Sequence, residues 1–395
     1  MSRYISDREI AIFGGGKIAR DYLVKYQLLS DVKYIIDNDE KKRGNEIGGI
    51  KILMPGQVRD WGHLFVIITT DQWQEIADQL ESYGMEYGRD FIEYSALVSL
   101  PMTAETIQKG VYEYFFSEKK ESEFEFFVDT REEYEELCRR YNYALEYPKM
   151  LELLYSKKCG KGGIYIGYCE ICGKMQNFVI RNREVYSWRE SVHDEKCKLN
   201  SRLRFTYSYI KKRFFNKRIY LYEQVTPLFQ YVSKLSEKVT GSEFLSPDLK
   251  GGAIVNGVRH EDARALSFEN NSFDVMVSCD VLEHISDYRQ ALNEAYRCLD
   301  WGGTLFISIP FYKHKEKSIS RVSINTDGSL NYLLEPQYHG NPISEKGSLV
   351  YTDFGWDFLD TLKKVGFREV HGLVYYSAEK AYLGRELPMM VIAEK

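Results

Sequence analysis

Cysteine, proline and long apolar stretches are scarce in this sequence. Seven cysteines among 395 residues are too few for a disulfide scaffold. Nine prolines leave most of the chain able to form regular elements. No run reaches the roughly 18 apolar residues of a membrane-spanning helix, and the first residues lack the charged-then-apolar pattern of a secretion signal. We therefore expect a cytoplasmic protein that inserts into no membrane.

Charge of neither sign gathers into a long block. Lys and Arg number 53 and Asp and Glu 58, which gives a net charge of -5. A sequence-independent nucleic-acid binder needs clustered positive charge to neutralise phosphates, so nucleic acid is not an expected partner. The 44% of hydrophobic residues predicts a folded chain, whose length favours two or three domains. A small-molecule or saccharide substrate is expected, and the sequence is compatible with a homo-oligomer.

Residues 1–100 show the order of strand, glycine turn and helix that is typical of nucleotide-binding domains. An apolar strand leads into Gly-Gly-Gly-Lys-Ile-Ala, in which Gly14 and Gly16 match the G-x-G-x-x-A fingerprint. A second apolar run ends at Asp37, about 20 residues further on, where a ribose-binding acid is expected. The continuing alternation of strands and helices predicts a parallel sheet. The glycines would serve either a nucleotide or the packing of the turn alone, and both interpretations stay open.

Residues 101–163 are rich in Glu, Tyr and Lys. Helical spacing recurs over 130–143 and 147–155, and Thr130 stands where a helix-capping residue is expected. We interpret this segment as a helical linker.

A cysteine knuckle is predicted over residues 164–204. Cys169 and Cys172 form a C-x-x-C, a hairpin between 176–180 and 185–188 follows, and Cys197 comes after it. Tetrahedral zinc takes four ligands, usually paired on tight turns. Asp194 has the spacing to Cys197 of a second C-x-x-C, whereas His193 is the better ligand chemically, so both are candidates for the fourth position. A structural zinc site and a metal-free hairpin with reduced thiols are the two interpretations.

Alternation of strands and helices resumes over residues 205–395. Apolar strands recur through this segment, and four acidic residues are expected at successive strand ends. Because ligands of an open parallel sheet bind beyond the carboxyl ends of its strands, we expect these acids around one crevice. They are Glu223, Glu243, Asp262 and Asp280.

The segments L-S-F-E-N-N-S-F-D-V-M-V-S-C-D-V-L-E-H and L-D-W-G-G-T-L-F-I-S-I-P resemble the class I methyltransferases that use S-adenosylmethionine. The short motifs H-E-D, G-S-E-F-L and Y-T-D-F-G-W-D resemble those of a bacterial branch of that superfamily, which carries a cysteine knuckle before its core. Residues 1–100, through I-F-G-G-G-K-I-A-R and I-I-D-N-D, resemble Rossmann-like domains that accompany sugar-modifying enzymes of bacterial surface-polysaccharide pathways. Together these resemblances imply an α/β chain with two Rossmann-like parallel-sheet domains, joined by a helical linker and a small zinc-ribbon-like knuckle.

The resemblance also implies roles for particular residues. Glu243 matches the acid that accepts hydrogen bonds from the ribose hydroxyls of the cofactor. Asp262 and the Ala263 backbone match the adenine contact, while Cys279 and Asp280 match the methionine side. The usual G-x-G-x-G loop is replaced by Glu-Gln-Val-Thr-Pro, so side chains of this loop are expected to hold the cofactor instead. These side chains are Glu223 and Gln224.

Two histidines are candidate catalytic bases, because the pKa of histidine lies near neutrality. His284 follows the fourth strand, and His339 lies in an insertion expected to cover the crevice. The predicted function is an S-adenosylmethionine-dependent methyltransferase acting on a sugar-containing surface-polysaccharide intermediate or a nucleotide-linked sugar. The alternative is a non-catalytic nucleotide-sugar-binding or assembly module with a degenerate methyltransferase fold, which the glycine-free loop favours. An NAD-dependent oxidoreductase is weaker, because residues 1–100 hold only half of the usual fold.

Overall fold

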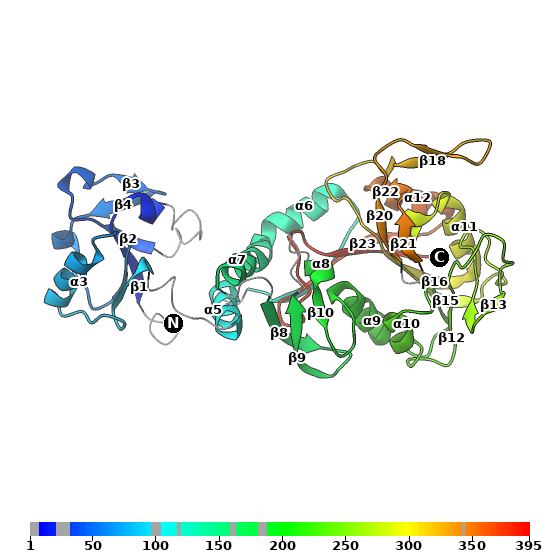
Figure 1. Ribbon diagram of the computed structural model, residues 1–395, viewed down its shortest axis with the longest axis horizontal. Helices are drawn as coiled ribbons and strands as arrows, with labels where there is room; N and C mark the ends of the chain where they lie inside the picture. The colour runs from blue at the N-terminus through cyan, green and yellow to red at the C-terminus, as the bar shows by residue number, and fades with distance from the viewer. Residues whose placement is uncertain are drawn as a thin grey trace. The chain divides into compact units, whose positions relative to one another are not determined.

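The computed structural model describes residues 8–20, 32–95, 104–116, 120–158, 163–180, 188–341 and 344–395. The chain divides into two compact units, Met1–Gly110 and Val111–Lys395 (Figure 1). Each unit is built around its own sheet. Both units are mixed α/β, as the sequence predicts.

The first unit contains a six-stranded sheet in the order β3-β4-β2-β1-β5-β6. Strands β1, β2, β4, β5 and β6 run parallel, and only β3 pairs antiparallel, with β4. Apolar side chains of the central strands and of helix α3 form its core. The predicted helix beyond residue 20 lies outside the described residues. The bounds are β1 Glu9–Phe13, β2 Val32–Ile36, β3 Glu46–Ile47, β4 Ile50–Leu53, β5 Leu64–Ile68, α3 Trp73–Ser82 and β6 Phe91–Glu93.

The second unit contains a seven-stranded sheet in the order β12-β11-β15-β16-β24-β23-β7. Strands β12, β11, β15 and β16 are parallel, and β24, β23 and β7 pair antiparallel along the other side. This is a mixed α/β sheet with helices on both faces. The bounds are β7 Glu123–Val128, β11 Ile219–Leu221, β12 Val239–Gly241, β15 Phe273–Cys279, β16 Leu299–Ser308, β23 Glu369–Ser377 and β24 Met389–Glu394.

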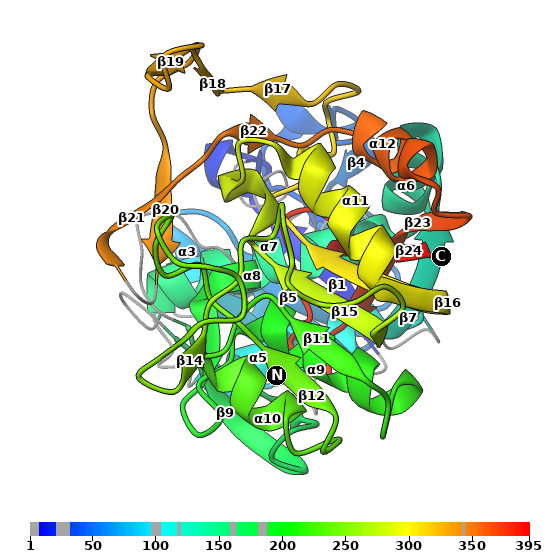
Figure 2. The ribbon, with the colours of Figure 1, turned by 90° about the vertical axis from the view of Figure 1, so that its right-hand side faces the viewer.

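Helices cover both faces of this sheet (Figure 2). Helices α9 (Ser201–Arg213) and α10 (Pro227–Val232) contact each other on one face, while α11 (Tyr288–Cys298) and α12 (Asp357–Val365) contact each other on the opposite face. Helix α11 buries an apolar stripe that includes Ala291, Leu292 and Ala295. Because both faces are covered, the parallel strands can be apolar throughout, as Val275–Val277 of β15 are.

The segment interpreted as a helical linker supplies an edge strand to the sheet of the second unit. Strand β7 pairs antiparallel with β23, and its buried Phe124 and Val128 alternate with exposed residues, among them Glu123 and Glu125. Phe124 of β7 stacks on Tyr376 of β23 with ring centroids 5.1 Å apart. Helices α5 (Ala104–Phe116), α6 (Arg131–Arg140) and α7 (Asn142–Lys158) account for the rest of the segment that is described. The strand escapes sequence analysis because it is short and its partner lies more than 240 residues later.

The knuckle forms a three-stranded antiparallel sheet in the order β10-β9-β8. Its strands are β8 Gly163–Cys169, β9 Lys174–Ile180 and β10 Val192–Asp194. The expected hairpin partner of β9 was 185–188, but 185–187 lie outside the described residues and Trp188 begins the short helix α8 (Trp188–Ser191). The Tyr168 amide donates to the Glu379 carbonyl at 2.8 Å, which ties the knuckle to the loop between β23 and β24.

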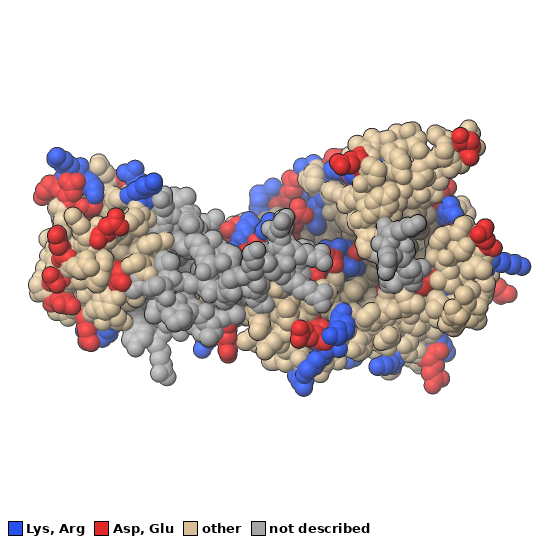
Figure 3. Space-filling view, in the orientation of Figure 1, with Lys and Arg blue, Asp and Glu red and all other residues tan. Residues whose placement is uncertain are grey.

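The remaining strands form small hairpins and bridges around the second sheet. They include β20 and β21, which pair antiparallel and place His339 opposite Ser348. None of the helices among the described residues is long and apolar enough to cross a membrane. On the face shown in Figure 3, acidic and basic side chains are interspersed. The bounds are β13 Ile254–Val255, β14 Val258–Arg259, β17 Ile319–Ser320, β18 Val322–Ile324, β19 Leu330–Tyr332, β20 Tyr338–Asn341, β21 Ser344–Leu349 and β22 Thr352–Asp353.

Candidate functional site

Strand register brings the predicted acids to one edge of the sheet. Leu221 of β11 pairs with Gly241 of β12 and with Val277 of β15. Two residues beyond these partners stand Glu223, Glu243 and Cys279, and Cys279 itself pairs with Ser308 of β16. All of these strands are parallel, so these residues lie at the carboxyl ends of neighbouring strands. The structure therefore brings Glu223 and Glu243 together at this edge, and Asp280 follows Cys279 there.

Glu223 is the most perturbed acid in this row. Its Oε1 atom is buried and has no hydrogen-bond partner. Burial raises the pKa of Glu223 to about 7, and the neighbouring Glu243 and Asp280 act in the same direction against Thr226 and Arg202. An orphaned carboxylate oxygen among other acids favours a cationic or hydrogen-bond-donating ligand.

We expect the protonation of Glu223 to make stability depend on pH. Its pKa is higher in the folded state than the ordinary value of about 4.5 for glutamate, so the unfolded state loses this proton first as the pH rises. The free energy of unfolding should therefore fall between about pH 4.5 and pH 7, by about 2–3 kcal/mol. Urea denaturation at pH 5 and pH 8 measures this difference. The variant Glu223→Gln should lose that part of the pH dependence, and an unchanged difference would contradict the assignment.

The glycine-free loop is held by Glu243. The backbone amides of Gln224 and Val225 donate to Glu243 Oε1 at 2.7 and 3.0 Å. Thr226 caps α10 by accepting from the Phe229 amide, and Pro227 occupies the first helical turn. None of the loop residues 223–227 has a positive φ angle. The loop thus adopts a conformation that Val and Pro tolerate, with a carboxylate bound to the amides that follow β11.

The Gln224 side chain is engaged away from the row of acids. Its Nε2 donates to the Gly257 carbonyl at 3.0 Å, and its Oε1 accepts from the Arg259 amide at 2.8 Å. These bonds connect the loop to the β13–β14 hairpin. The structure therefore gives Gln224 a structural partner on each end of its amide, whereas Glu223 keeps an unpartnered oxygen.

Asp262 and Ala263 lie in a turn beyond β14, and a backbone hydrogen bond connects the start of this turn to Glu243. The Glu261 amide donates to the Glu243 carbonyl at 3.1 Å, which places the turn beside β12. Asp262 makes an ion pair with Arg264, with Nη2 and Oδ2 2.7 Å apart. The Arg264 side chain holds the pKa of Asp262 below its ordinary value.

Asp280 is clamped by two arginines that the sequence analysis missed. Arg189 of α8 and Arg202 of α9 each approach its carboxylate to 2.8 Å. Burial alone would raise the pKa of Asp280, but the two arginines lower it. Burial would likewise lower the pKa of Arg202, but Asp280 and Glu190 raise it. The knuckle region thus contributes charge to the carboxyl edge of the sheet, which residue spacing could not reveal.

Cys279 and Asp280 end β15 with an unusual backbone. Asp280 has a φ of 53°, in the left-handed region that Asp tolerates better than most residues. Its amide donates to the Ser308 carbonyl at 2.7 Å. Burial raises the pKa of the Cys279 thiol, and Glu223 adds to this effect. Cys279 is therefore a neutral thiol near Glu223.

The two candidate histidines meet around a buried glutamate. The rings of His284 and His339 are 5.0 Å apart, centroid to centroid. His284 Nε2 lies 3.7 Å and His339 Nδ1 3.6 Å from Glu283 Oε1. Glu283 raises the pKa of His339. Both histidines are thus brought to one place, although β20 and the turn after β15 are far apart in the sequence.

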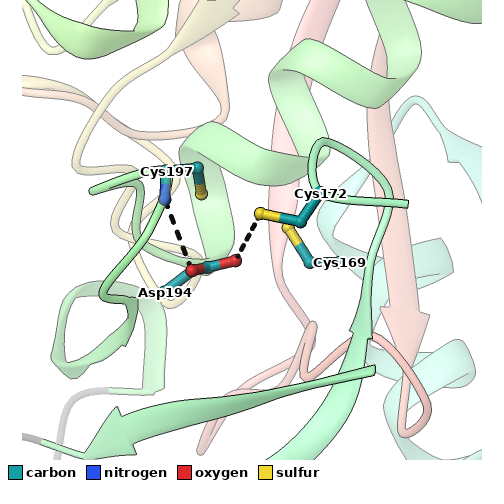
Figure 4. Close-up of side chains that lie close together, drawn as sticks. All are labelled: Cys169, Cys172, Asp194 and Cys197. Carbon is teal, nitrogen blue, oxygen red and sulfur yellow. Dashed lines mark hydrogen bonds between the residues drawn. The ribbon is translucent and has the colours of Figure 1, made fainter. Parts of the chain in front are cut away.

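Three cysteines and Asp194 form a compact cluster (Figure 4). One ligand atom from each of Cys169, Cys172, Asp194 and Cys197 lies within 4.8 Å of the others. Cys172 Sγ donates to Asp194 Oδ2 at 3.3 Å, and Asp194 Oδ1 accepts from the Cys197 amide at 3.3 Å. Cys169 and Cys197 are buried.

The two halves of this cluster share one turn geometry. In the first, the Gly173 amide donates to the Cys169 carbonyl at 2.8 Å, and Gly173 has a φ of 70°. In the second, the Lys198 amide donates to the Asp194 carbonyl at 2.8 Å, and Lys198 has a φ of 62°. Asp194 therefore occupies the place that Cys169 holds in the first turn.

His193 does not join the cluster. Strand β10 turns successive side chains to opposite faces of its sheet, so His193 and its neighbour Asp194 diverge. The His193 Nε2 atom lies 2.6 Å from the Glu190 carbonyl oxygen. Of the two candidates for the fourth ligand, the structure groups only Asp194 with the cysteines.

The glycine turn of the first unit contacts the predicted ribose acid. The Gly15 amide donates to Asp37 Oδ2 at 2.6 Å, and Lys42 Nζ lies 2.8 Å from the same oxygen. Gly14 has a φ of 113°, and a Cβ on Gly15 would lie 2.8 Å from Ile52. A Cβ on Gly16 would meet nothing within 4 Å. Packing therefore explains the first two glycines but not Gly16.

Residues 227–307 match a family model described as a methyltransferase domain. The match begins after β11 and the glycine-free loop and ends in β16. No curated protein matches the chain. Within the second unit, the family match therefore spans the part of the sheet from α10 to β16.

Solved structures similar to the chain include two methyltransferases. An S-adenosylmethionine-dependent methyltransferase from Mesorhizobium loti is 17% identical, with 49% of this chain and 97% of that chain covered and a TM-score of 0.33. The 1,6-didemethyltoxoflavin-N1-methyltransferase of Burkholderia thailandensis, solved with its substrate and S-adenosylhomocysteine, is 15% identical. There, 49% of this chain and 77% of that chain are covered, with a TM-score of 0.28.

Proposed function

We propose that this chain is an S-adenosylmethionine-dependent methyltransferase. The observation that carries the proposal is the register-matched row of Glu223, Glu243 and Cys279 at the carboxyl ends of parallel strands, within a methyltransferase-like sheet. The unpartnered Glu223 oxygen and the acids beside it fit a ligand that carries positive charge and hydroxyl groups. The cofactor would supply an activated methyl group bonded to a positively charged sulfur.

The residues of the crevice would divide the work of binding. Glu243 would orient ribose hydroxyls through the carboxylate oxygen that does not hold the loop amides. Asp262 and Ala263 would face the adenine, and Cys279 and Asp280 the methionine part. Glu223 would take the place of the missing glycine loop as the charged contact beside the cofactor.

We propose a sugar-containing acceptor, either a surface-polysaccharide intermediate or a nucleotide-linked sugar. The support is the resemblance of the first unit to domains that accompany sugar-modifying enzymes. Within the first unit, the turn at Gly16, where packing does not explain the glycine, and Asp37 would bind a nucleotide or nucleotide-linked sugar on their own. His284 and His339 would act on the acceptor side of the crevice.

We further propose that Cys169, Cys172, Asp194 and Cys197 hold a structural zinc ion. The matched turns and the gathering of three sulfur atoms and one carboxylate fit a tetrahedral ion. Cys169 ends β8, Asp194 ends β10 and Cys197 precedes α9 by four residues, so the ion would stabilise the segment that carries Arg189 and Arg202.

One observation favours a second candidate function, a binding module without catalysis. Glu243 already accepts from two amides of the glycine-free loop, so the loop amides are not free to approach a cofactor. A degenerate methyltransferase fold that binds only in the first unit would account for this arrangement.

Calorimetric titration with S-adenosylhomocysteine separates the two functions. A methyltransferase should bind it, and Glu243→Gln should weaken binding by roughly 10–100-fold, because a charge-assisted hydrogen bond contributes about 1.5–3 kcal/mol. Glu237→Gln is the matched control, since Glu237 is exposed just before the opposite end of β12. No binding to the wild-type protein at millimolar ligand would reject the methyltransferase and leave the binding module.

A further inference from the structure

Glu283 is a buried carboxylate that nothing in the described part of the chain satisfies. Its side chain is 1% exposed. Neither Oε1 nor Oε2 has a hydrogen-bond partner. Leaving an ionised carboxylate in this state is costly unless a proton or a cation compensates it. The surroundings of Glu283 therefore point to a missing positive partner.

Two imidazole nitrogens face this carboxylate. His284 Nε2 and His339 Nδ1 lie 3.7 and 3.6 Å from Glu283 Oε1, too far for hydrogen bonds. Ligands that each lie about 2.0–2.2 Å from one ion are separated by roughly 3.0–3.6 Å, which is close to these distances. One ligand atom from each of the three residues lies within 4.8 Å of the other two.

Hydrogen bonds on the far side of each ring keep the facing nitrogens available. His284 Nδ1 lies 2.8 Å from the Leu349 carbonyl oxygen, to which it can only donate. The proton of neutral His284 is therefore on Nδ1, and the lone pair of Nε2 faces Glu283. His339 Nε2 lies 3.3 Å from the Gln337 amide, whose oxygen and nitrogen can exchange places to accept from it. Backbone and amide partners of this kind orient histidines that ligate metals.

We propose that Glu283, His284 and His339 form a second metal site, which binds a divalent transition metal ion through two imidazole nitrogens and one carboxylate oxygen. This donor set suits Zn²⁺, Mn²⁺, Fe²⁺ or Co²⁺, and it leaves coordination positions open. The site is separate from the cysteine cluster, because it shares no residue with it.

The open positions would take an oxygen ligand from the acceptor. Glu283 lies three residues after Asp280 in the chain, and the charges of Asp280 and His339 shift each other's pKa, so the site borders the proposed cofactor crevice. A hydroxyl or carboxylate oxygen of the acceptor would bind the ion beside the methyl donor. This role rests on the proposed function, and it makes the two histidines ligands in place of free bases, since a coordinated nitrogen cannot accept a proton.

Cobalt(II) titration of the full-length protein tests the site without any cofactor. Protein stripped of metal and then given one equivalent of Zn²⁺, which the thiolates of the cysteine cluster take first, should bind one added Co²⁺ with the visible absorption of nitrogen and oxygen ligands and without sulfur-to-cobalt charge transfer. The variants Glu283→Gln and His339→Ala should each weaken this binding at least 100-fold. His63→Ala is the control, because His63 lies 3.5 Å from a single carboxylate, that of Asp60, on the surface of the first unit.

Equal Co²⁺ affinity in the wild-type protein and in Glu283→Gln would overturn the proposal, as would a wild-type protein that binds no Co²⁺. If the wild-type protein binds no Co²⁺, the interpretation that stands is an ion pair between Glu283 and a protonated His339. Circular dichroism of each variant shows whether weak binding reflects unfolding, and Glu283→Gln should remain folded because the amide removes an uncompensated charge. S-adenosylhomocysteine binding is measured separately. Cobalt binding without S-adenosylhomocysteine binding would reject the proposed function alone. S-adenosylhomocysteine binding without cobalt binding would reject only the metal site.

Discussion

Replacing Cys197 by Ser is expected to release one equivalent of zinc and to lower the melting temperature of the protein by about 10 °C, or ~4 kcal/mol. Cys197 is buried, and its sulfur belongs to the cluster with Cys169, Cys172 and Asp194. Loss of one thiolate leaves three ligands for an ion that prefers four. Metal analysis of the purified variant and a thermal melt measure the two effects. Cys138→Ser, in α6 and outside the cluster, should change neither.

The fourth ligand can be tested with neighbouring substitutions. Asp194→Cys completes a four-cysteine set in the matched turn geometry and should bind zinc more tightly than the wild-type protein. His193→Ala should retain the metal, because its ring contacts the Glu190 carbonyl instead of the cluster. Zinc loss from His193→Ala with retention in Asp194→Ala would show that the ligand is the histidine.

Replacing Arg202 by Leu is the second change with a large expected effect, a loss of about 3–5 kcal/mol in the free energy of unfolding. Arg202 is 8% exposed and makes ion pairs with Asp280 at 2.8 Å and Glu190 at 3.2 Å. Its removal leaves these acids without a buried partner, and Arg189 remains to compensate only part of the charge. Urea denaturation monitored by circular dichroism measures the change.

Arg213→Leu is the matched control on the same helix. Arg213 is 42% exposed, and its ion pair with Glu125 spans 3.4 Å, so its loss should change stability by about 0–1 kcal/mol. The variant Arg202→Leu combined with Asp280→Asn should lose less than the sum of the two single changes, because the uncompensated acid is gone. A loss below 1 kcal/mol for Arg202→Leu would mean that the clamp on Asp280 contributes little.

Local patterns predicted the strands of both sheets well. The apolar run that ends at Ile36 and the run before Asp280 are strands β2 and β15 in the structure. The expected alternation with helices is also present, for example at α3 and α11. These elements could be predicted because hydrophobic periodicity and turn residues act over a few residues.

Contacts between distant segments could not be predicted in the same way. Strand β7 reads as part of a helical linker, yet it completes the sheet through β23. The clamp on Asp280 needs α8 and α9 to pack against the end of β15, and no motif marks Arg189 or Arg202 for that role. Likewise, no spacing indicates that Glu283 and His339 meet.

The sequence by itself determined the alternating α/β architecture, the acids at the strand ends and the cysteine spacing, because each depends on short-range order along the chain. The tertiary structure alone decided that Asp194 and not His193 joins the cysteines, that Gln224 holds the β13–β14 hairpin, and that two histidines converge on Glu283. These outcomes depend on which face of a strand a side chain occupies and on pairings between segments far apart in the sequence. Strand pairing and helix packing determine both the face that a side chain occupies and the distant segment that it meets.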